Sequence, residues 1–382
     1  MLSIFYKDFA IVSQGRKVFF SAISGNILEY YDFTVYAVFS LVIGKLFFPG
    51  QSEFGQALSG LAVFAVGFLT RPIGGILFGY IGDTFGRRIA LICSMGGMTF
   101  STFSMGLIPS YDDIGIFAPI TLVMMRLVQG LCISGEGTGA AIFVLEHYGN
   151  FRAGLVTGVV QGSNIFGSLI ATFVGMMLIG SAYEEHAWRI AFLLGGIMGM
   201  IGFYLRLRVA ETPIFKQLSS QKKILKAPFI HVIKTAWRPV CLTICIAGTA
   251  GSIVQLIKIY VNVFLQREMH FSSSDALLYT SYALFITMLS MAVSGAMSDY
   301  FGKLKMITFA ALGMLFCSLP VFILLSSPIF WQQMLALTLL GMIAGAIAGN
   351  AYIFVISLFT PEERFTGVSF SYNLGVALFG GT

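Results

Sequence analysis

Long apolar runs separated by short polar segments dominate the chain. Most of these runs reach or exceed about 20 residues, the length that a helix needs to cross the hydrocarbon core of a bilayer. Backbone groups inside a bilayer must be hydrogen-bonded internally, so the runs predict membrane-spanning helices and an all-α fold. The predicted spans are residues 18–44, 54–81, 89–109, 116–145, 153–180, 188–207, 239–264, 276–298, 304–325, 330–358 and 366–382.

The composition narrows the class of protein. Hydrophobic residues make up 57% of the 382 positions and charged residues 10%, whereas soluble domains are about 25% charged. These few polar side chains cannot cover a soluble surface, which excludes a soluble enzyme and a disordered chain. The five cysteines lack CxxC spacing and the four histidines are scattered, so no metal site is expected. With no nucleophile–base pair or phosphate loop in the sequence, we expect neither an enzyme nor a bound cofactor.

Positive charge is distributed unevenly between the two sides of the predicted membrane. The net charge is +6 and, with the N-terminus inside, 17 of the 23 lysines and arginines fall in inward segments and 3 in outward segments. This bias predicts a cytoplasmic N-terminus by the positive-inside rule. The basic residues therefore set the orientation and do not indicate a nucleic-acid partner.

One polar stretch, residues 208–238, divides the chain into two parts. We expect it to be a cytoplasmic linker between an N-terminal six-helix half, residues 1–207, and a C-terminal half, residues 239–382.

The two halves repeat one another. Gly79-Tyr-Ile-Gly-Asp83-Thr-Phe-Gly86-Arg87-Arg88 follows the second span, and Gly295-Ala-Met-Ser-Asp299-Tyr-Phe-Gly302-Lys303-Leu-Lys305 follows the eighth. Arg152 and Arg364 form a second matching pair on the same side. A parallel repeat of six spans predicts a transporter with two halves related by an axis along the membrane normal. On that plan we expect the chain to be truncated within the eleventh span.

The first loop is similar to the GxxxD(R/K)xGR(R/K) loop of the major facilitator superfamily. Within it the chain resembles the metabolite:proton symporter family, most closely its proline/betaine transporters. The segments that carry this resemblance are Gly25-Asn-Ile-Leu-Glu29-Tyr-Tyr-Asp32-Phe33, Arg71-Pro-Ile-Gly-Gly75, Arg126-Leu-Val-Gln129-Gly130, Gly135-Glu136-Gly-Thr-Gly139, Trp188-Arg189 and Glu211-Thr-Pro213.

The resemblance implies a major facilitator fold in a bacterial inner membrane and symport of a small metabolite or osmolyte with protons by alternating access. It favours proline or glycine betaine as the substrate and a proton gradient as the energy source, and we expect a monomer in the bilayer. Where the family usually has a tyrosine-rich run, this chain has Gln255-Leu-Ile-Lys258-Ile-Tyr260, which leaves a 2-oxoglutarate or dicarboxylate symporter open. A non-transporting truncated remnant is the alternative from another class.

Charges inside the spans are the candidates for the transport chemistry, because an ionisable group in a bilayer is costly and marks function by default. Glu29 and Asp32 are three residues apart on one helix and share a face with Asn26 and Tyr36. Two carboxyls this close raise each other's proton affinity, so either one is a candidate proton carrier. The alternative is a structural pair held by a buried arginine.

The fourth span adds Arg126, Gln129 and Glu136 on roughly one side. Arg126 and Glu136 lie about 15 Å apart along a helix and cannot pair directly. We hypothesise that Arg126 pairs with Asp32 or Glu29 and releases it on protonation. The alternative is a fixed ion pair that only stabilises the bundle. The candidate proton-coupling residues are Glu29, Asp32, Arg126 and Glu136.

Lys258 is the only charge in the middle of a span of the second half. It either binds a substrate carboxylate or extends to the outer interface. Tyr30, Tyr31 and Tyr36 form either a cage for a quaternary ammonium or ordinary packing. The candidate substrate cavity is Asn26, Tyr30, Tyr36, Gln129 and Lys258.

The repeated loops, as the resemblance implies, form a cytoplasmic gate that pairs with neighbouring helix ends in the outward-open state. The alternative is that their charges only anchor the topology. The gate candidates are Gly79, Asp83, Gly86, Arg87, Arg88, Arg152, Asp299, Lys303 and Arg364. Glycines that recur every four residues, at 154, 158 and 162, predict close helix packing on the fifth span.

Overall fold

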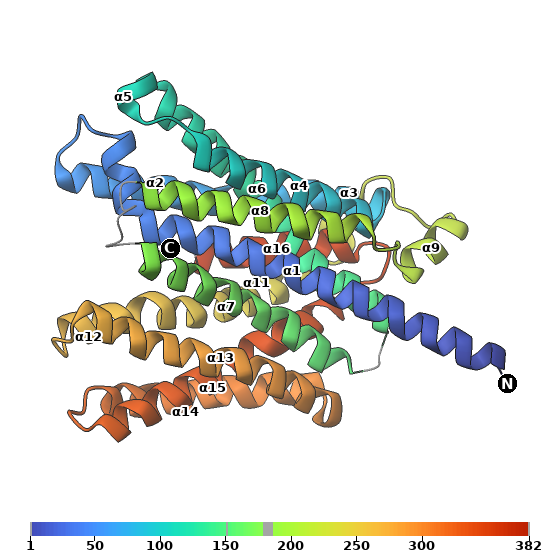
Figure 1. The fold of residues 1–382 in the computed structure, drawn as a ribbon. Coiled ribbons are helices and arrows are strands. Elements are labelled where there is room, and N and C mark those ends of the chain that lie inside the picture. Colours follow the sequence, from blue (N-terminus) through green and yellow to red (C-terminus); the bar gives the residue numbers. More distant parts are fainter. Residues whose placement is uncertain (1, 150–151, 179–185, 381–382) are drawn as a thin grey trace.

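A computed structural model describes residues 2–149, 152–178 and 186–380, and the described part of the chain is helical without β-strands. Figure 1 shows long helices lying side by side in one bundle, with the short helices α5 and α12 at one end and α9 at the other. The fold class predicted from the apolar runs is confirmed. Ten of the described helices are long and apolar enough to cross a membrane.

Among the described residues, the N-terminal half has eight helices, the C-terminal half has six helices and one π-helix, and two short helices connect the halves. The first group is α1 (Leu2–Phe47), α2 (Glu53–Leu69), α3 (Arg71–Thr84), α4 (Arg87–Leu107), α5 (Tyr111–Ile114), α6 (Phe117–Tyr148), α7 (Ala153–Leu178) and α8 (Ala187–Leu207). The connecting helices are α9 (Pro213–Ser220) and α10 (Pro228–Thr235). The second group is α11 (Trp237–Gln255), the π-helix η2 (Leu256–Val261), α12 (Asn262–Arg267), α13 (Ser273–Phe301), α14 (Lys303–Leu325), α15 (Phe330–Ile356) and α16 (Arg364–Phe379).

Local sequence explains where several helices begin. The second predicted span is divided at Thr70, with Pro72 in the first turn of α3, where the missing backbone N–H of proline costs least. The polar linker is not extended throughout, because Pro213 and Pro228 each start a short helix. At α9, the Thr212 hydroxyl accepts a hydrogen bond from the Phe215 amide at 3.1 Å and caps the helix.

Apolar side chains face outward over much of the bundle, as a lipid-facing surface requires. On α14, for example, Phe309 is 73% exposed and Phe316 71%. Polar and charged side chains are instead gathered in the interior, where Arg126, Asp32 and Glu136 are at most 1% exposed. The fold therefore encloses the ionisable groups that the sequence marks as candidates for function.

The most extensive contacts between the halves are those of α3 with α16 and of α7 with α13, and α7 also packs on α15 and α6 on α16. A Cβ atom on Gly79 would lie only 2.6 Å from the Cα of Thr366, and Gly154 packs in the same way against the Gly295 backbone. Only glycine allows helices to approach this closely. The predicted small-residue surface of the fifth span is thus a contact between the halves.

Candidate functional site

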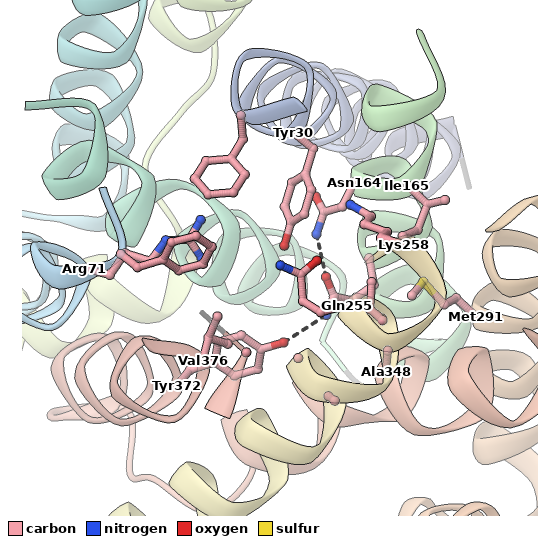
Figure 2. Close-up of a pocket in the computed structure, with 17 residues that line it drawn as sticks. Tyr30, Arg71, Asn164, Ile165, Gln255, Lys258, Met291, Ala348, Tyr372 and Val376 are labelled. Atoms are coloured by element: carbon pink, nitrogen blue, oxygen red, sulfur yellow. Dashed lines mark hydrogen bonds between the residues drawn. The ribbon is translucent and has the colours of Figure 1, made fainter. Parts of the chain in front are cut away.

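A cavity lies between the halves near the centre of the bundle (Figure 2). The space between its lining residues measures about 620 Å³, including the part open to solvent. Both halves supply side chains. The lining residues are Tyr30, Phe33, Phe68, Arg71, Gln161, Asn164, Ile165, Ala250, Gly251, Val254, Gln255, Lys258, Met291, Ala348, Tyr372, Val376 and Gly380.

The N-terminal half contributes one cation to this cavity, Arg71, which is the first residue of α3 and is 6% exposed. Its guanidinium lies 5.0 Å from the ring centre of Phe33 and 4.7 Å from that of Phe68, which fixes it by cation–π contacts. Its Nε atom has no hydrogen-bond partner. Arg71 lies inside the second predicted span, residues 54–81, and this position in a span is the signal that could have marked it, but sequence reasoning assigned it no role.

Lys258 is the C-terminal half's cation and lies in η2, the π-helical segment of the seventh span. Its Nζ donates a hydrogen bond to the Ser168 hydroxyl of α7 at 2.9 Å and lies 5.1 Å from the centre of the Tyr30 ring. Of the two interpretations of Lys258, this geometry matches a side chain that faces the cavity. The π-helix adds one residue to a turn and so changes where side chains point, a feature often found at functional sites.

Amide and hydroxyl groups complete the cavity wall. Gln161 donates to the Tyr372 hydroxyl at 3.2 Å, and Asn164 donates to Gln161 at 2.6 Å (Figure 2). The Oδ1 atom of Asn164 has no partner. These side chains give the cavity polar groups that can orient a ligand.

Of the five predicted cavity residues, Tyr30 and Lys258 line the cavity, and the other three lie outside it. Asn26 donates to the Val160 carbonyl at 3.0 Å, and Tyr36 donates to the Gly60 carbonyl at 3.3 Å. Gln129 bonds within the N-terminal half. These polar groups satisfy buried partners inside one half, and helical spacing alone could not distinguish that from facing the cavity.

The suggested tyrosine cage is not assembled. Tyr31 donates to the Ala191 carbonyl of α8 at 2.9 Å, away from the cavity. The ring of Tyr36 is covered by the Arg126 guanidinium, 4.1 Å from its centre. Consecutive helical residues point about 100° apart, so Tyr30 and Tyr31 cannot share one site.

Asp32 and Arg126 are connected through two neutral side chains. The Thr102 hydroxyl of α4 donates to Asp32 Oδ2, Gln129 Nε2 donates to that hydroxyl at 3.1 Å, and Arg126 donates to Gln129 Oε1. Among the described residues Arg126 forms no ion pair within 4.0 Å, so the direct pairing hypothesised from the sequence is absent in this conformation. Asp32 Oδ1 has no hydrogen-bond partner.

Glu29 and Glu136 have different surroundings. Glu29 is 4% exposed and its Oε2 atom has no partner. A Cβ atom on Gly137 would lie 3.2 Å from this oxygen and 3.1 Å from the Tyr352 hydroxyl of α15, so a larger residue would require these side chains to shift by a few tenths of an ångström. Glu136 forms an ion pair with Arg206 of α8 and accepts from Ser94 at 3.1 Å, which leaves it a poorer candidate proton carrier than Glu29 or Asp32.

The gate candidates of the N-terminal half meet the start of α16. Both Asp83 oxygens accept backbone N–H groups of that helix, from Phe365 at 3.2 Å and Thr366 at 2.8 Å. Arg87 lies 3.3 Å from Asp83 and donates to the Pro361 carbonyl at 2.6 Å. These bonds join the two halves at one end of the bundle.

Glu146 of α6 extends this network. It lies 3.3 Å from Arg87 and 3.3 Å from Arg364, and it accepts from Thr212 at 2.7 Å. Sequence reasoning missed Glu146, because an acid near the end of an apolar run has no distinctive spacing.

The C-terminal half repeats the contact with fewer charges. Asp299 of α13 accepts from the backbone N–H groups of Gly154 at 2.7 Å and Leu155 at 3.0 Å, at the start of α7. No ion pair of Lys303 is found among the described residues. Arg152 precedes α7 with a positive φ of 49°.

The last two gate candidates, Gly86 and Arg88, lie at the start of α4, where Glu211 of the linker contacts them. Gly86 has a φ of 122°, which suits glycine. Arg88 binds the Leu207 carbonyl at 2.8 Å, and Glu211 accepts the Arg88 backbone N–H at 3.0 Å. Burial raises the pKa of the Glu211 carboxyl, against the hydrogen bonds from the amides of Thr212 and Arg88. Arg88 therefore braces the N-terminal half and does not reach the other half.

Comparisons with known proteins agree with this architecture. The chain is 32% identical over 388 residues to the glycine betaine/proline/ectoine/pipecolic acid transporter OusA of Dickeya dadantii (strain 3937), covering 98% of this chain and 77% of OusA. It is 30% identical over 389 residues to the proline/betaine transporter of Escherichia coli (strain K12), covering 98% and 78%.

Solved structures share the fold at lower identity. The proton:xylose symporter XylE, bound to 6-bromo-6-deoxy-D-glucose, superposes with a TM-score of 0.71 at 19% identity, covering 96% of this chain and 87% of XylE. The human organic anion transporter MFSD10 superposes with a TM-score of 0.67 at 17% identity, covering 96% and 92%. The profile of the Major Facilitator Superfamily matches residues 19–382. The chain therefore belongs to the Major Facilitator Superfamily and is a multi-pass membrane transporter, not an enzyme.

Proposed function

We propose that this protein is a proton-coupled symporter of a small carboxylate-bearing osmolyte, with proline or glycine betaine as the first candidates. The printed functions of the bacterial relatives support these substrates. The 17-to-3 distribution of basic residues supports an orientation with the N-terminus in the cytoplasm. We also propose that the protein lies in the bacterial inner membrane, because its relatives are bacterial transporters and its helices are long and apolar enough to span a bilayer.

The observation that carries the proposal is the Asp32 carboxyl with its free oxygen. Asp32 is fully buried, its Oδ1 atom has no partner, and its Oδ2 atom is linked to Arg126 through Thr102 and Gln129. A proton on Oδ1 removes the carboxylate charge and weakens this link. Asp32 is therefore the proposed proton carrier, and Glu29, which also has an unpartnered oxygen, is the second candidate.

Transport then requires the two halves to separate at the end of the bundle where Asp83 and Asp299 join them, which we call the interlocked end. Asp83 and Asp299 each hold a helix start of the opposite half. We propose that these bonds break and reform as the halves rock around the cavity, while the opposite end opens and closes in turn.

A dicarboxylate symporter is the second candidate function. Arg71 and Lys258 lie on opposite sides of the cavity in Figure 2, and none of the described residues that line it is acidic. Two separated cations suit a ligand with two carboxylates, such as 2-oxoglutarate, at least as well as a zwitterion.

Uptake into proteoliposomes tests the proposal. Wild-type protein is expected to accumulate radiolabelled glycine betaine or proline under an imposed inward proton gradient, and an uncoupler is expected to abolish accumulation. Asp32→Asn is expected to lose accumulation but to retain exchange of labelled for unlabelled substrate. Asp112→Asn, at an exposed position of the short helix α5, is the matched control. Accumulation that survives the uncoupler would show that protons do not drive transport.

A further inference from the structure

Two cations that form no ion pair with the described residues face the cavity. Arg71 comes from the N-terminal half and Lys258 from the C-terminal half. The ion pairs formed by the described residues include neither of them, and no aspartate or glutamate is among the described residues that line the cavity. Glu29 acts electrostatically on Arg71 but does not approach it within 4.0 Å. Burying a cation without a close counter-ion costs several kcal/mol, so an anion bound in the cavity would compensate these charges.

The two cations also differ in how firmly they are held. Arg71 is clamped between the rings of Phe33 and Phe68, and its Nε atom is unpartnered. Lys258 ends a flexible side chain and donates to a neutral hydroxyl, that of Ser168. A guanidinium binds a carboxylate through two parallel hydrogen bonds, whereas an ammonium acts as a mobile point charge.

We propose that Arg71 and Lys258 form a carboxylate-binding site divided between the halves, in which Arg71 anchors the carboxylate and Lys258 closes on it. A carboxylate adds the attraction between opposite charges to its hydrogen bond with the Lys258 ammonium, which the neutral Ser168 hydroxyl does not, so it displaces Ser168 as the acceptor of Lys258. Because Ser168 lies on α7 and Lys258 on η2, ligand binding exchanges a contact between the halves.

The remaining wall restricts the rest of the ligand. Tyr30, Phe33, Phe68 and Tyr372 present aromatic rings to the cavity, and Ala250, Gly251 and Val376 are small or apolar. Such a wall takes a compact apolar or cationic body. The inferred ligand class is a small carboxylate, and only its identification as proline or glycine betaine rests on the proposed function.

Binding to purified protein in lipid nanodiscs tests the site without requiring transport. The probes are glycine betaine, proline and 2-oxoglutarate, each compared with a carboxylate-free analogue: choline, proline amide and the dimethyl ester of 2-oxoglutarate. We expect at least one carboxylate to bind and its analogue to bind at least 10-fold more weakly. Arg71→Gln and Lys258→Met are expected to weaken carboxylate binding by roughly 10- to 100-fold, from the value of a hydrogen bond to a charged group.

Ser168→Ala distinguishes a ligand-binding lysine from a structural one. Removing the competing acceptor is expected to tighten carboxylate binding by roughly 2- to 10-fold, whereas loss of a merely structural bond would weaken it or leave it unchanged. Lys305→Met, which removes an exposed cation outside the cavity, is the matched control and should bind as wild type does.

The outcomes separate this inference from the proposed function. Carboxylate binding that depends on Arg71 and Lys258, without proton-driven accumulation in proteoliposomes, supports the site and overturns the symport proposal. Accumulation of glycine betaine by Arg71→Gln and Lys258→Met with unchanged affinity supports transport and overturns the site. Failure of the wild-type protein to bind any of the three carboxylates also overturns the site.

Discussion

Asp299 of α13 accepts a hydrogen bond from the backbone N–H of Gly154, the second residue of α7, at 2.7 Å. Asp83 does the same for α16, where Thr366 donates at 2.8 Å. Each aspartate thus caps a helix of the opposite half, placing a negative charge at the positive end of that helix. The loop repeat seen in the sequence is a repeat of this contact.

The two caps differ in strength, which gives a first prediction. Asp83 is buried beside Arg87, whereas Asp299 is exposed. Loss of a cap costs about 0.5–2 kcal/mol, and breaking a buried ion pair costs about 3–5 kcal/mol. Asp83→Ala is therefore expected to open the interlocked end more than Asp299→Ala does.

Cysteine labelling measures this difference. Gly251→Cys places a thiol in the cavity wall, where a Cβ atom would have ordinary contacts at 3.5 Å. In a background without the native cysteines, a membrane-impermeant reagent added from the interlocked end should label it roughly 2- to 30-fold faster in Asp299→Ala and faster still in Asp83→Ala. Equal rates in the two variants would contradict the asymmetry.

Close packing at Gly79 gives a second prediction. An added Cβ atom would lie 2.6 Å from the backbone of Thr366, so Gly79→Ala should push α3 and α16 apart and weaken the interlock. Gly313→Ala adds the same methyl group at 3.7 Å from Ile343, an ordinary contact. We expect faster cavity labelling and a lower thermal unfolding midpoint for Gly79→Ala only. A shift of the same size in both variants would indicate a general effect of losing glycine in a helix.

Thr102 carries the third prediction, because its hydroxyl joins Asp32 to Gln129. Thr102→Val keeps the shape of the side chain and removes a donor to a charged group, worth about 1.5–3 kcal/mol. Proton-driven accumulation of glycine betaine should fall at least 10-fold, while substrate exchange persists. Thr99→Val on the same helix removes a buried hydroxyl that has no partner and should leave accumulation intact. A similar loss in both variants would point to packing of α4 and not to the link.

The sequence predicts the membrane helices well, because lipid requires long apolar runs, and the repeat of the aspartates in register marks Asp83 and Asp299 as matching positions of the two halves. It does not predict which polar side chains connect the buried charges. Thr102 looks unremarkable in an apolar helix, and Arg206, at the end of the predicted span 188–207, is 2% exposed and paired with Glu136. Helical spacing gives the face of one helix, but a site formed between helices depends on the rotation of each helix against its neighbours.

Glu211 gives a fourth prediction, on pH. Burial raises the pKa of its carboxyl above the ordinary value of 4.5, although the amides of Thr212 and Arg88 donate to it. The folded state therefore binds this proton more tightly than the unfolded state does. Its contribution to stability is fully present below the ordinary pKa and is lost as the pH rises through the raised value.

Thermal unfolding of purified protein at a fixed scan rate tests this sign. As the pH rises from about 4.5, the unfolding midpoint of wild type should fall relative to that of Glu211→Gln, which cannot ionise. Glu268→Gln, at an exposed position, is the control and should run parallel to wild type. If wild type instead gains stability over Glu211→Gln with rising pH, the amide donors at the start of α4 outweigh burial, and the ionised carboxylate is the form that caps the helix.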